Sequence, residues 1–130
     1  MVSTTESWCQ MCILIVEDDE IIRDVIAEYL ASCGLPVVVA SDGDAAAELI
    51  ENPPRRFSVL VTDFHMPGSR SGCDVAEHMR AFHPHVHLFI MTGRPDVLMA
   101  SCADGLPFGV IYKPVPLTRL SQRIAHLVER

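Results

Sequence analysis

The chain has 130 residues, of which 49% are hydrophobic and 21% are charged, and its formal net charge is -7 at pH 7. A single domain of this size buries roughly two-thirds of its unfolded surface, and the composition excludes a disordered or membrane-embedded class. The acidic balance also argues against a basic surface for phosphate backbones, so we expect no direct nucleic-acid binding. The longest apolar stretches run to only a few residues, so we expect no membrane span.

The first ten residues lack the basic start and apolar stretch of a secretory signal, so we expect a cytoplasmic protein. We predict a poorly ordered N-terminal extension over residues 1–10 and one domain over residues 11–130. No linker, repeat or low-complexity segment divides that second range.

An apolar run over residues 11–16 predicts a fully buried first strand, and Glu17, Asp18, Asp19 and Glu20 follow it directly. Open α/β sheets place their ligand sites at the carboxyl ends of strands. Crowded carboxylates repel one another and tolerate each other best around a hard cation such as Mg²⁺. A solvated acidic turn is the alternative interpretation of the cluster.

Strands and helices alternate along the rest of the chain. Further strands are predicted at residues 37–40, 57–62, 86–91 and 110–112. Helices are predicted from Ile21 to Leu30, after a cap at Asp42 or Asp44, from Val75 to near Pro84, from Pro95 to Asp104, and from Leu117 to Leu127. We expect the apolar stripe on the first helix to face the core; it comprises Ile21, Ile22, Val25, Ile26, Tyr29 and Leu30.

Five short apolar strands that alternate with five helices predict an α/β fold. Each crossover between parallel strands is right-handed and carries its helix back over the sheet. The expected architecture is therefore a doubly wound, five-stranded parallel sheet with helices on both faces.

Polar residues follow four of the predicted strands, and a parallel sheet brings these strand ends to one edge. They are Glu17 and Asp18, Asp63, Thr92 and Lys113. This set indicates phosphoryl transfer onto Asp63, because a carboxylate can act as the nucleophile while a bound cation offsets its charge. The lysine ammonium and the threonine hydroxyl would each contact a phosphoryl oxygen.

Over residues 11 to 129 the chain resembles the receiver domains of two-component response regulators. The matching pieces are Ile-Leu-Ile-Val-Glu-Asp-Asp-Glu, Val-Leu-Val-Thr-Asp-Phe-His-Met-Pro-Gly, Phe-Ile-Met-Thr-Gly and Tyr-Lys-Pro. The resemblance implies a flavodoxin-like sheet of order 2-1-3-4-5 and a cis Lys113-Pro114 bond. It also implies that Asp63 accepts phosphate from a histidine kinase or a histidine phosphotransfer protein.

Site roles also follow from this resemblance. Mg²⁺, with Mn²⁺ as a substitute, would be held directly by Asp18 and Asp63, through water by Glu17, and by the main-chain carbonyl of His65. Thr92 and Lys113 match the switch hydroxyl and the site lysine. His65 and Arg94 border the path of attacking water in this family, which leads to the hypothesis that they tune the lifetime of the phosphorylated state. The alternative interpretation is that His65 and Arg94 are solvated loop residues without such a role.

In this family the output is a conformational shift of the face formed by the helix from Pro95, the strand at residues 110–112 and the last helix. The resemblance implies a downstream protein target, a monomer or phosphorylation-dependent dimer, and no catalysis beyond the protein's own phosphorylation and dephosphorylation. Many receivers carry Tyr or Phe three residues before the lysine, where this chain has Val110. A receiver-like interaction module that works without phosphorylation, and a phosphatase of the haloacid dehalogenase type, are the rival interpretations.

The cysteine count is five, an odd number scattered through apolar segments, so we expect reduced, buried thiols rather than a disulfide framework. The five are Cys9, Cys12, Cys33, Cys73 and Cys102. A Cys9-x-x-Cys12 pair without a second spaced pair indicates a zinc site only weakly.

Overall fold

A computed structural model describes residues 12–54 and 56–128. The predicted extension over residues 1–10 lies outside this part of the chain. Five strands and five helices alternate, with the bounds β1 (Cys12–Val16), α2 (Glu20–Ser32), β2 (Val37–Ala40), α3 (Gly43–Glu51), β3 (Phe57–Asp63), α4 (Gly72–Phe82), β4 (His87–Thr92), α5 (Pro95–Ser101), β5 (Gly109–Tyr112) and α6 (Leu117–Val128).

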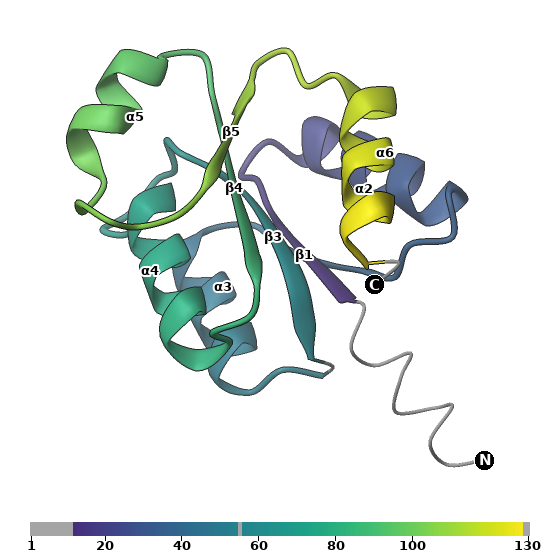
Figure 1. Ribbon diagram of the computed structural model, residues 1–130, viewed down its shortest axis with the longest axis horizontal. Coiled ribbons are helices and arrows are strands. Elements are labelled where there is room, and N and C mark those ends of the chain that lie inside the picture. The colour runs from purple at the N-terminus through teal and green to yellow at the C-terminus, as the bar shows by residue number, and fades with distance from the viewer. Residues whose placement is uncertain (1–11, 55, 129–130) are drawn as a thin grey trace.

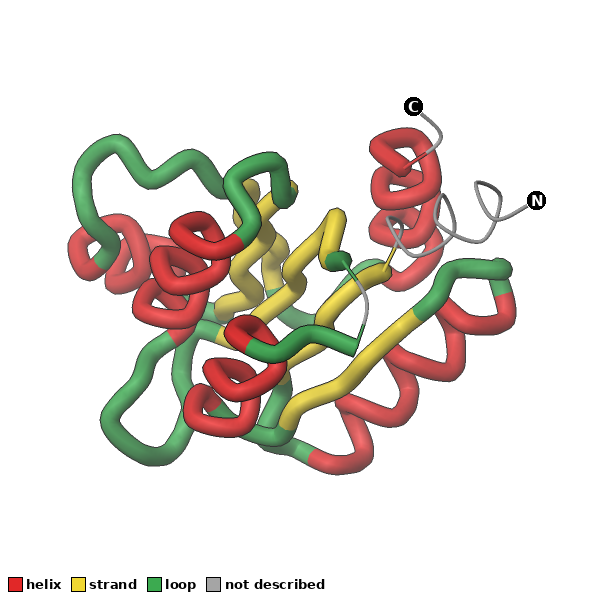
Figure 2. The backbone as a smooth tube through the Cα atoms, turned by 90° about the horizontal axis from the view of Figure 1, so that it is seen from below, coloured by secondary structure: helices red, strands yellow, loops and turns green. Residues whose placement is uncertain are grey.

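The strands form one parallel sheet in the order β2-β1-β3-β4-β5, which confirms the predicted topology (Figure 1). Figure 2 shows the strands running between two groups of helices, with α3, α4 and α5 on one face of the sheet and α2 and α6 on the other. Among the described helices, none is long and apolar enough to cross a membrane.

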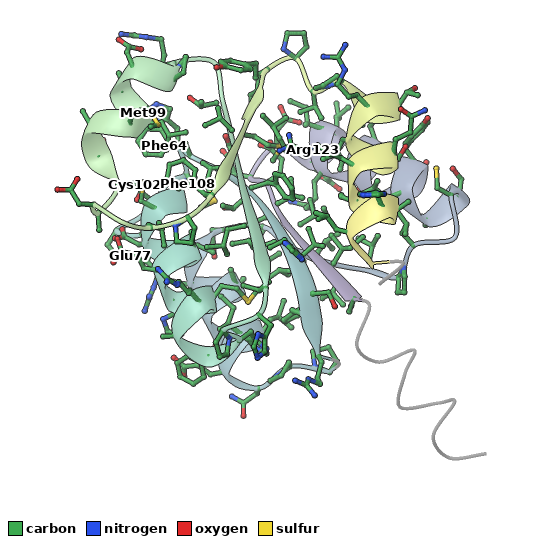
Figure 3. All side chains as sticks on the ribbon, in the orientation of Figure 1. Phe64, Glu77, Met99, Cys102, Phe108 and Arg123 are labelled. Atoms are coloured by element: carbon green, nitrogen blue, oxygen red, sulfur yellow. A yellow bond between two sulfur atoms is a disulfide. The ribbon has the colours of Figure 1, made fainter. Side chains whose placement is uncertain are left out.

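Alternation along the strands divides the apolar side chains between two cores. Leu14 and Leu60 belong to the core under α3, α4 and α5, whereas Ile13 and Val61 belong to the core under α2 and α6. Figure 3 shows Phe64, Cys102 and Phe108 on the first side and Arg123 on α6 at the other. Because both faces are covered, the strands are nearly continuous apolar runs, as a parallel sheet requires.

Aspartate side chains cap the starts of α2 and α3. The Asp19 carboxylate accepts a hydrogen bond from the Ile22 N–H at the start of α2, and Asp42 does the same for Ala45 at the start of α3. Of the two predicted candidates, Asp42 is thus the cap of α3, and Asp44 lies in its first turn.

The prediction for the apolar stripe of α2 is wrong in part. Ile26 and Leu30 are buried, but Ile21 is 76% exposed, Val25 is 48% exposed and Ile22 is 38% exposed. The stripe is wider than the strip of sheet that α2 covers, so its amino-terminal half projects into solvent.

The prediction of reduced, buried cysteines is also wrong in part. Cys73 and Cys102 form a disulfide with a Cα–Cα distance of 5.2 Å, and Cys33 is exposed. Cys12 is buried in β1 as expected, and Cys9 lies outside the described residues. The fold packs α4 near the end of α5, which brings together two cysteines that are 29 residues apart.

The same region explains why α5 is shorter than predicted. The helix ends at Ser101 rather than Asp104, because Cys102 adopts an extended backbone with ψ 151° and is linked to Cys73. A residue with this ψ value cannot continue an α-helix.

Candidate functional site

Three carboxylates meet at the carboxyl edge of the sheet. β1 and β3 are neighbours, with Val16 in register with Thr62, so the residues that follow or end these strands lie side by side. Oxygen atoms of Glu17, Asp18 and Asp63 all lie within 4.8 Å of one another. Glu17 and Asp63 are buried, whereas Asp18 is exposed to solvent.

Lys113 directly follows the edge strand β5 and brings a positive charge to these acids. Its Nζ lies 2.9 Å from Asp63 Oδ1 and 3.3 Å from Glu17 Oε1. The Lys113 main-chain N–H donates to the Thr92 carbonyl at 3.0 Å, which fixes the start of the side chain next to β4. The Lys113-Pro114 bond is cis, which confirms that expectation.

Burial makes the two buried acids harder to ionise than ordinary carboxyl groups. Desolvation raises the pKa of Glu17 to about 7, against the opposing effects of the Asp19 N–H and of Lys113. Desolvation also raises the pKa of Asp63, although the hydrogen bond and charge of Lys113 oppose this. Desolvation would lower the pKa of Lys113, but its contacts with Asp63 and Glu17 raise it overall, so the lysine keeps its charge.

Thr92 ends β4 with a buried hydroxyl. Its Oγ1 accepts a hydrogen bond from the Arg94 N–H at 2.8 Å. Across the edge of the sheet, Thr92 is in register with Tyr112, and Ile90 is in register with Val110. Val110 packs partly buried against the core, while Tyr112, at the end of β5, is 62% exposed.

The two residues expected at the rim take different positions. The exposed His65 ring packs edge-on against Phe64, with ring centroids 4.5 Å apart. The Arg94 guanidinium lies 3.3 Å from the Asp96 carboxylate in the first turn of α5. Arg94 therefore reaches the site through its main chain, while its side chain pairs with an acid on the following helix.

Three further residues support the site and are absent from the sequence-based set. The Thr62 hydroxyl donates to the Asp63 carbonyl at 3.0 Å, and Arg23 donates to the Glu17 carbonyl at 3.1 Å. At Gly72, which starts α4, a Cβ atom would overlap the Asp63 carbonyl oxygen and lie 2.8 Å from the Phe64 Cα atom. A glycine between a loop and a helix is the one local signal that could have indicated this close approach.

The donor set matches a hard divalent cation. Mg²⁺ binds through carboxylate and carbonyl oxygens and keeps several waters, and the exposed Asp18 leaves room for them. Within the described residues, no second group of three or more histidine, cysteine or acidic side chains converges in this way.

Comparison with known proteins supplies the family. The family model for the response regulator receiver domain matches residues 13–125. A cyclic di-GMP phosphodiesterase from Thermotoga maritima is 35% identical over 117 residues, which are 89% of this chain and 30% of that protein. The sensor kinase CckA of Brucella abortus is 26% identical over 91% of this chain and 12% of its own length. The chain thus spans under a third of either relative.

Among solved structures, the receiver domain protein from Clostridium thermocellum superposes with a TM-score of 0.78 at 27% identity. The alignment covers 92% of this chain and 94% of that one.

Proposed function

Because the chain belongs to the response regulator receiver domain family, we propose that Asp63 accepts a phosphoryl group from a histidine kinase or a histidine phosphotransfer protein. The observation that carries this proposal is the buried Asp63 carboxylate, which lies 2.9 Å from the Lys113 ammonium and beside Glu17 and Asp18. Receiver domains are signalling domains, and the proposed chemistry is limited to the protein's own phosphorylation and dephosphorylation.

The metal in this proposal is Mg²⁺, with Mn²⁺ as a substitute. Asp18 and Asp63 would bind it directly, Glu17 would act through water, and the His65 main-chain carbonyl would complete the protein ligands. When bound, the cation offsets the repulsion between the carboxylates and the incoming phosphoryl oxygens.

The protein groups provide the remaining steps. One Asp63 carboxylate oxygen attacks phosphorus, the bond from phosphorus to the donor's histidine nitrogen breaks, and that nitrogen leaves with the electron pair. The Lys113 ammonium stabilises one phosphoryl oxygen. The Thr92 oxygen already accepts a hydrogen bond from the Arg94 N–H, so its own hydrogen can be donated to another phosphoryl oxygen.

An apolar surface beside the site gives the phosphodonor a place to dock. The exposed Ile21, Ile22 and Val25 of α2 line a cavity of ≈ 500 Å³, together with Pro114 and Leu117. Lys113 lies on the same cavity, so a partner that packs there comes next to the group that contacts Asp63. This placement suits a helical partner that carries a phosphohistidine.

Phosphorylation would change the conformation of the face formed by α5, β5 and α6, and this face would transmit the signal. Thr92 joins the acceptor site to this face, because its hydroxyl is bonded to the residue that precedes α5. The proposed recipient is a downstream protein rather than nucleic acid, and the protein would act in the cytoplasm as a monomer or a phosphorylation-dependent dimer.

The test is phosphorylation by a small donor. Purified protein incubated with acetyl phosphate and Mg²⁺ should gain a label that is stable in acid and labile in base. Asp63→Ala should abolish the label. Asp104→Ala, which removes an exposed carboxylate from the loop between α5 and β5, should leave the label unchanged. Equal labelling of the wild type and Asp63→Ala would contradict the assignment of the acceptor.

A further inference from the structure

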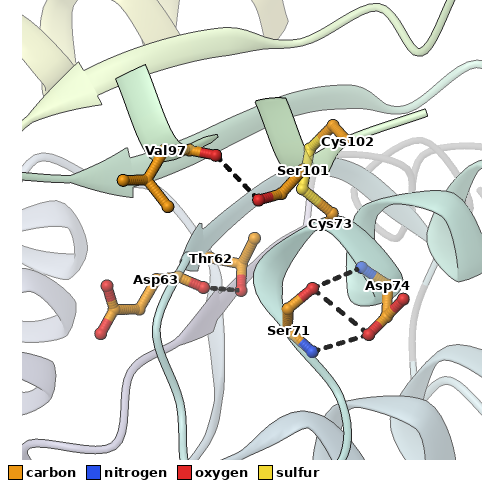
Figure 4. The surroundings of a disulfide bond; sticks show 8 residues. All are labelled: Thr62, Asp63, Ser71, Cys73, Asp74, Val97, Ser101 and Cys102. Carbon is orange, nitrogen blue, oxygen red and sulfur yellow. Dashed lines mark hydrogen bonds between the residues drawn. A yellow bond between two sulfur atoms is a disulfide. The ribbon is translucent and has the colours of Figure 1, made fainter. Parts of the chain in front are cut away.

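The disulfide between Cys73 and Cys102 joins two elements with different relations to the acceptor. Cys73 is the second residue of α4, whose first residue contacts the main chain of Asp63 and Phe64. Cys102 directly follows α5, the helix that begins at Pro95, three residues beyond Thr92. Figure 4 shows the bond beside the Ser71–Asp74 capping box of α4 and the carboxyl end of β3.

Apart from this bond, α5 is weakly held. The structure describes all seven of its residues, of which Leu98 alone is buried, and Met99 is 63% exposed. No side chain caps its first turn. The Arg80 guanidinium donates to the Gly105 carbonyl at 3.4 Å, which is a long, exposed link between α4 and the segment after α5. A helix with so little buried surface opens locally at low cost unless a covalent bond restrains it.

The described part of the protein therefore contains a covalent restraint on the helix that carries the proposed output. We propose that Cys73 and Cys102 form a thiol–disulfide switch that holds α5 against α4 when oxidised and releases α5 to respond to phosphorylation when reduced. This inference rests on the proposed function for its link to phosphorylation. The restraint on α5 itself is a separate, measurable property.

The redox step needs a partner of the glutathione class. Cys102 is partly exposed, whereas Cys73 is 3% exposed, so the Cys102 thiolate attacks glutathione disulfide first and releases one glutathione thiol. The Cys73 thiolate then attacks the Cys102 sulfur of the mixed disulfide and releases the second glutathione. Two protein thiols lose two electrons and two protons, and one glutathione disulfide becomes two glutathione thiols.

The reverse reaction returns the protein to its dithiol form. A glutathione thiolate attacks the more accessible Cys102 sulfur, and Cys73 leaves from the first turn of α4, where the helix dipole stabilises a thiolate. A second glutathione thiolate then attacks the glutathione sulfur of the mixed disulfide, which releases the Cys102 thiolate and one glutathione disulfide. Disulfides in reducing compartments are mostly transient and regulatory, which agrees with the proposed cytoplasmic setting.

The test compares oxidised and reduced wild-type protein by hydrogen exchange in peptides that cover residues 95–102. Before phosphorylation, reduction should speed exchange in this segment by about tenfold, since the restraint on local opening is lost. After acetyl phosphate and Mg²⁺ are added, exchange there should change in the reduced form and stay nearly constant in the oxidised form. The double variant Cys73→Ser/Cys102→Ser should behave as the reduced protein under both conditions.

The matched control is Cys33→Ser, which removes an exposed cysteine outside the bridge and should keep the full response to reduction. Equal exchange in oxidised and reduced protein would overturn the switch, as would a bridge that stays oxidised across a series of glutathione buffers. Labelling of Asp63 is scored in the same samples. If α5 responds to reduction but Asp63 is never labelled, the restraint stands and the proposed phosphorylation fails.

Discussion

At the scale of single residues, the site is an arrangement of buried acids around one ammonium group. Glu17 is 1% exposed, and desolvation raises its pKa to about 7, while the pKa of Asp63 is raised in the same direction. Lys113 contacts both acids but balances only one negative charge. The folded protein without metal therefore disfavours full ionisation of its own site, and the excess negative charge favours binding of a cation.

The first prediction concerns the pH dependence of stability without metal. The unfolded chain releases the Glu17 proton near pH 4.5, but the folded protein keeps it until about pH 7, so the free energy of unfolding should fall across this window as pH rises. Glu17→Gln should remove much of this fall, on the order of 1–2 kcal/mol, in urea unfolding series with EDTA. The exposed Glu48→Gln is the control, and an unchanged slope in Glu17→Gln would contradict the desolvation of Glu17 as the cause of the fall.

The second prediction concerns the residues at the rim. His65 lies two residues beyond the acceptor on an exposed loop, and the Arg94 guanidinium pairs with Asp96. We expect His65→Asn and Arg94→Ala each to alter the dephosphorylation rate severalfold, measured as loss of label after removal of the donor. Asp96→Ala frees the guanidinium without deleting it and should change the rate differently from Arg94→Ala. Equal rates in all four proteins would leave both residues as solvated loop positions.

At the scale of elements, the start of α4 determines how closely this helix approaches β3. Ser71 and Asp74 form a capping box, and the Gly72 N–H donates to the Phe64 carbonyl at 2.9 Å. The absence of a Cβ atom at Gly72 allows the helix to lie directly against the main chain of Asp63. The position of the acceptor thus depends on the packing of a helix as well as on its strand.

The third prediction follows from this contact. Gly72→Ala should lower the free energy of unfolding by about 2 kcal/mol, because the new methyl group must displace the main chain of β3. The same change should slow labelling of Asp63 by acetyl phosphate. At Gly93 a Cβ atom would meet nothing within 4 Å, so Gly93→Ala is the control for stability. Equal stability of the two variants would show that α4 can shift without cost.

At the scale of the whole molecule, the ends of β1 and β3 create one acidic edge on an acidic protein. The net charge is -7, and three of the carboxylates that contribute to it lie within 4.8 Å of one another. A cation that binds only the folded arrangement stabilises it by mass action.

The fourth prediction is that Mg²⁺ raises the midpoint of thermal unfolding. At a free concentration 100 times the dissociation constant the gain should be about 2.7 kcal/mol, which corresponds to several degrees for a chain of this length. Asp18→Asn should reduce the shift strongly, whereas Asp24→Asn, at an exposed site on α2, should keep it. A shift of the same size in Asp18→Asn would place the cation elsewhere.

Sequence periodicity was sufficient for the elements and for the place of the site. Buried parallel strands are continuous apolar runs, and helices show caps and spaced apolar residues, so β2 was predicted with its observed bounds and the other strands to within about a residue. Because parallel strands end at one edge, Glu17, Asp63 and Lys113 were expected together, and the structure brings them into contact. The resemblance to receiver domains added the strand order.

Only the tertiary structure decided which apolar side chains are buried and which cysteines pair. Periodicity marks an apolar stripe on α2 but not how much of it the sheet covers, so the exposure of Ile21 and Val25 was missed. Cysteine spacing likewise gives no distance in space, so the bond between Cys73 and Cys102 was not expected. The local sequence determines the conformation of each segment, because apolar spacing and helix caps involve residues only a few positions apart. Contacts between distant segments depend on how the elements pack, and in this protein that packing includes the restraint on α5.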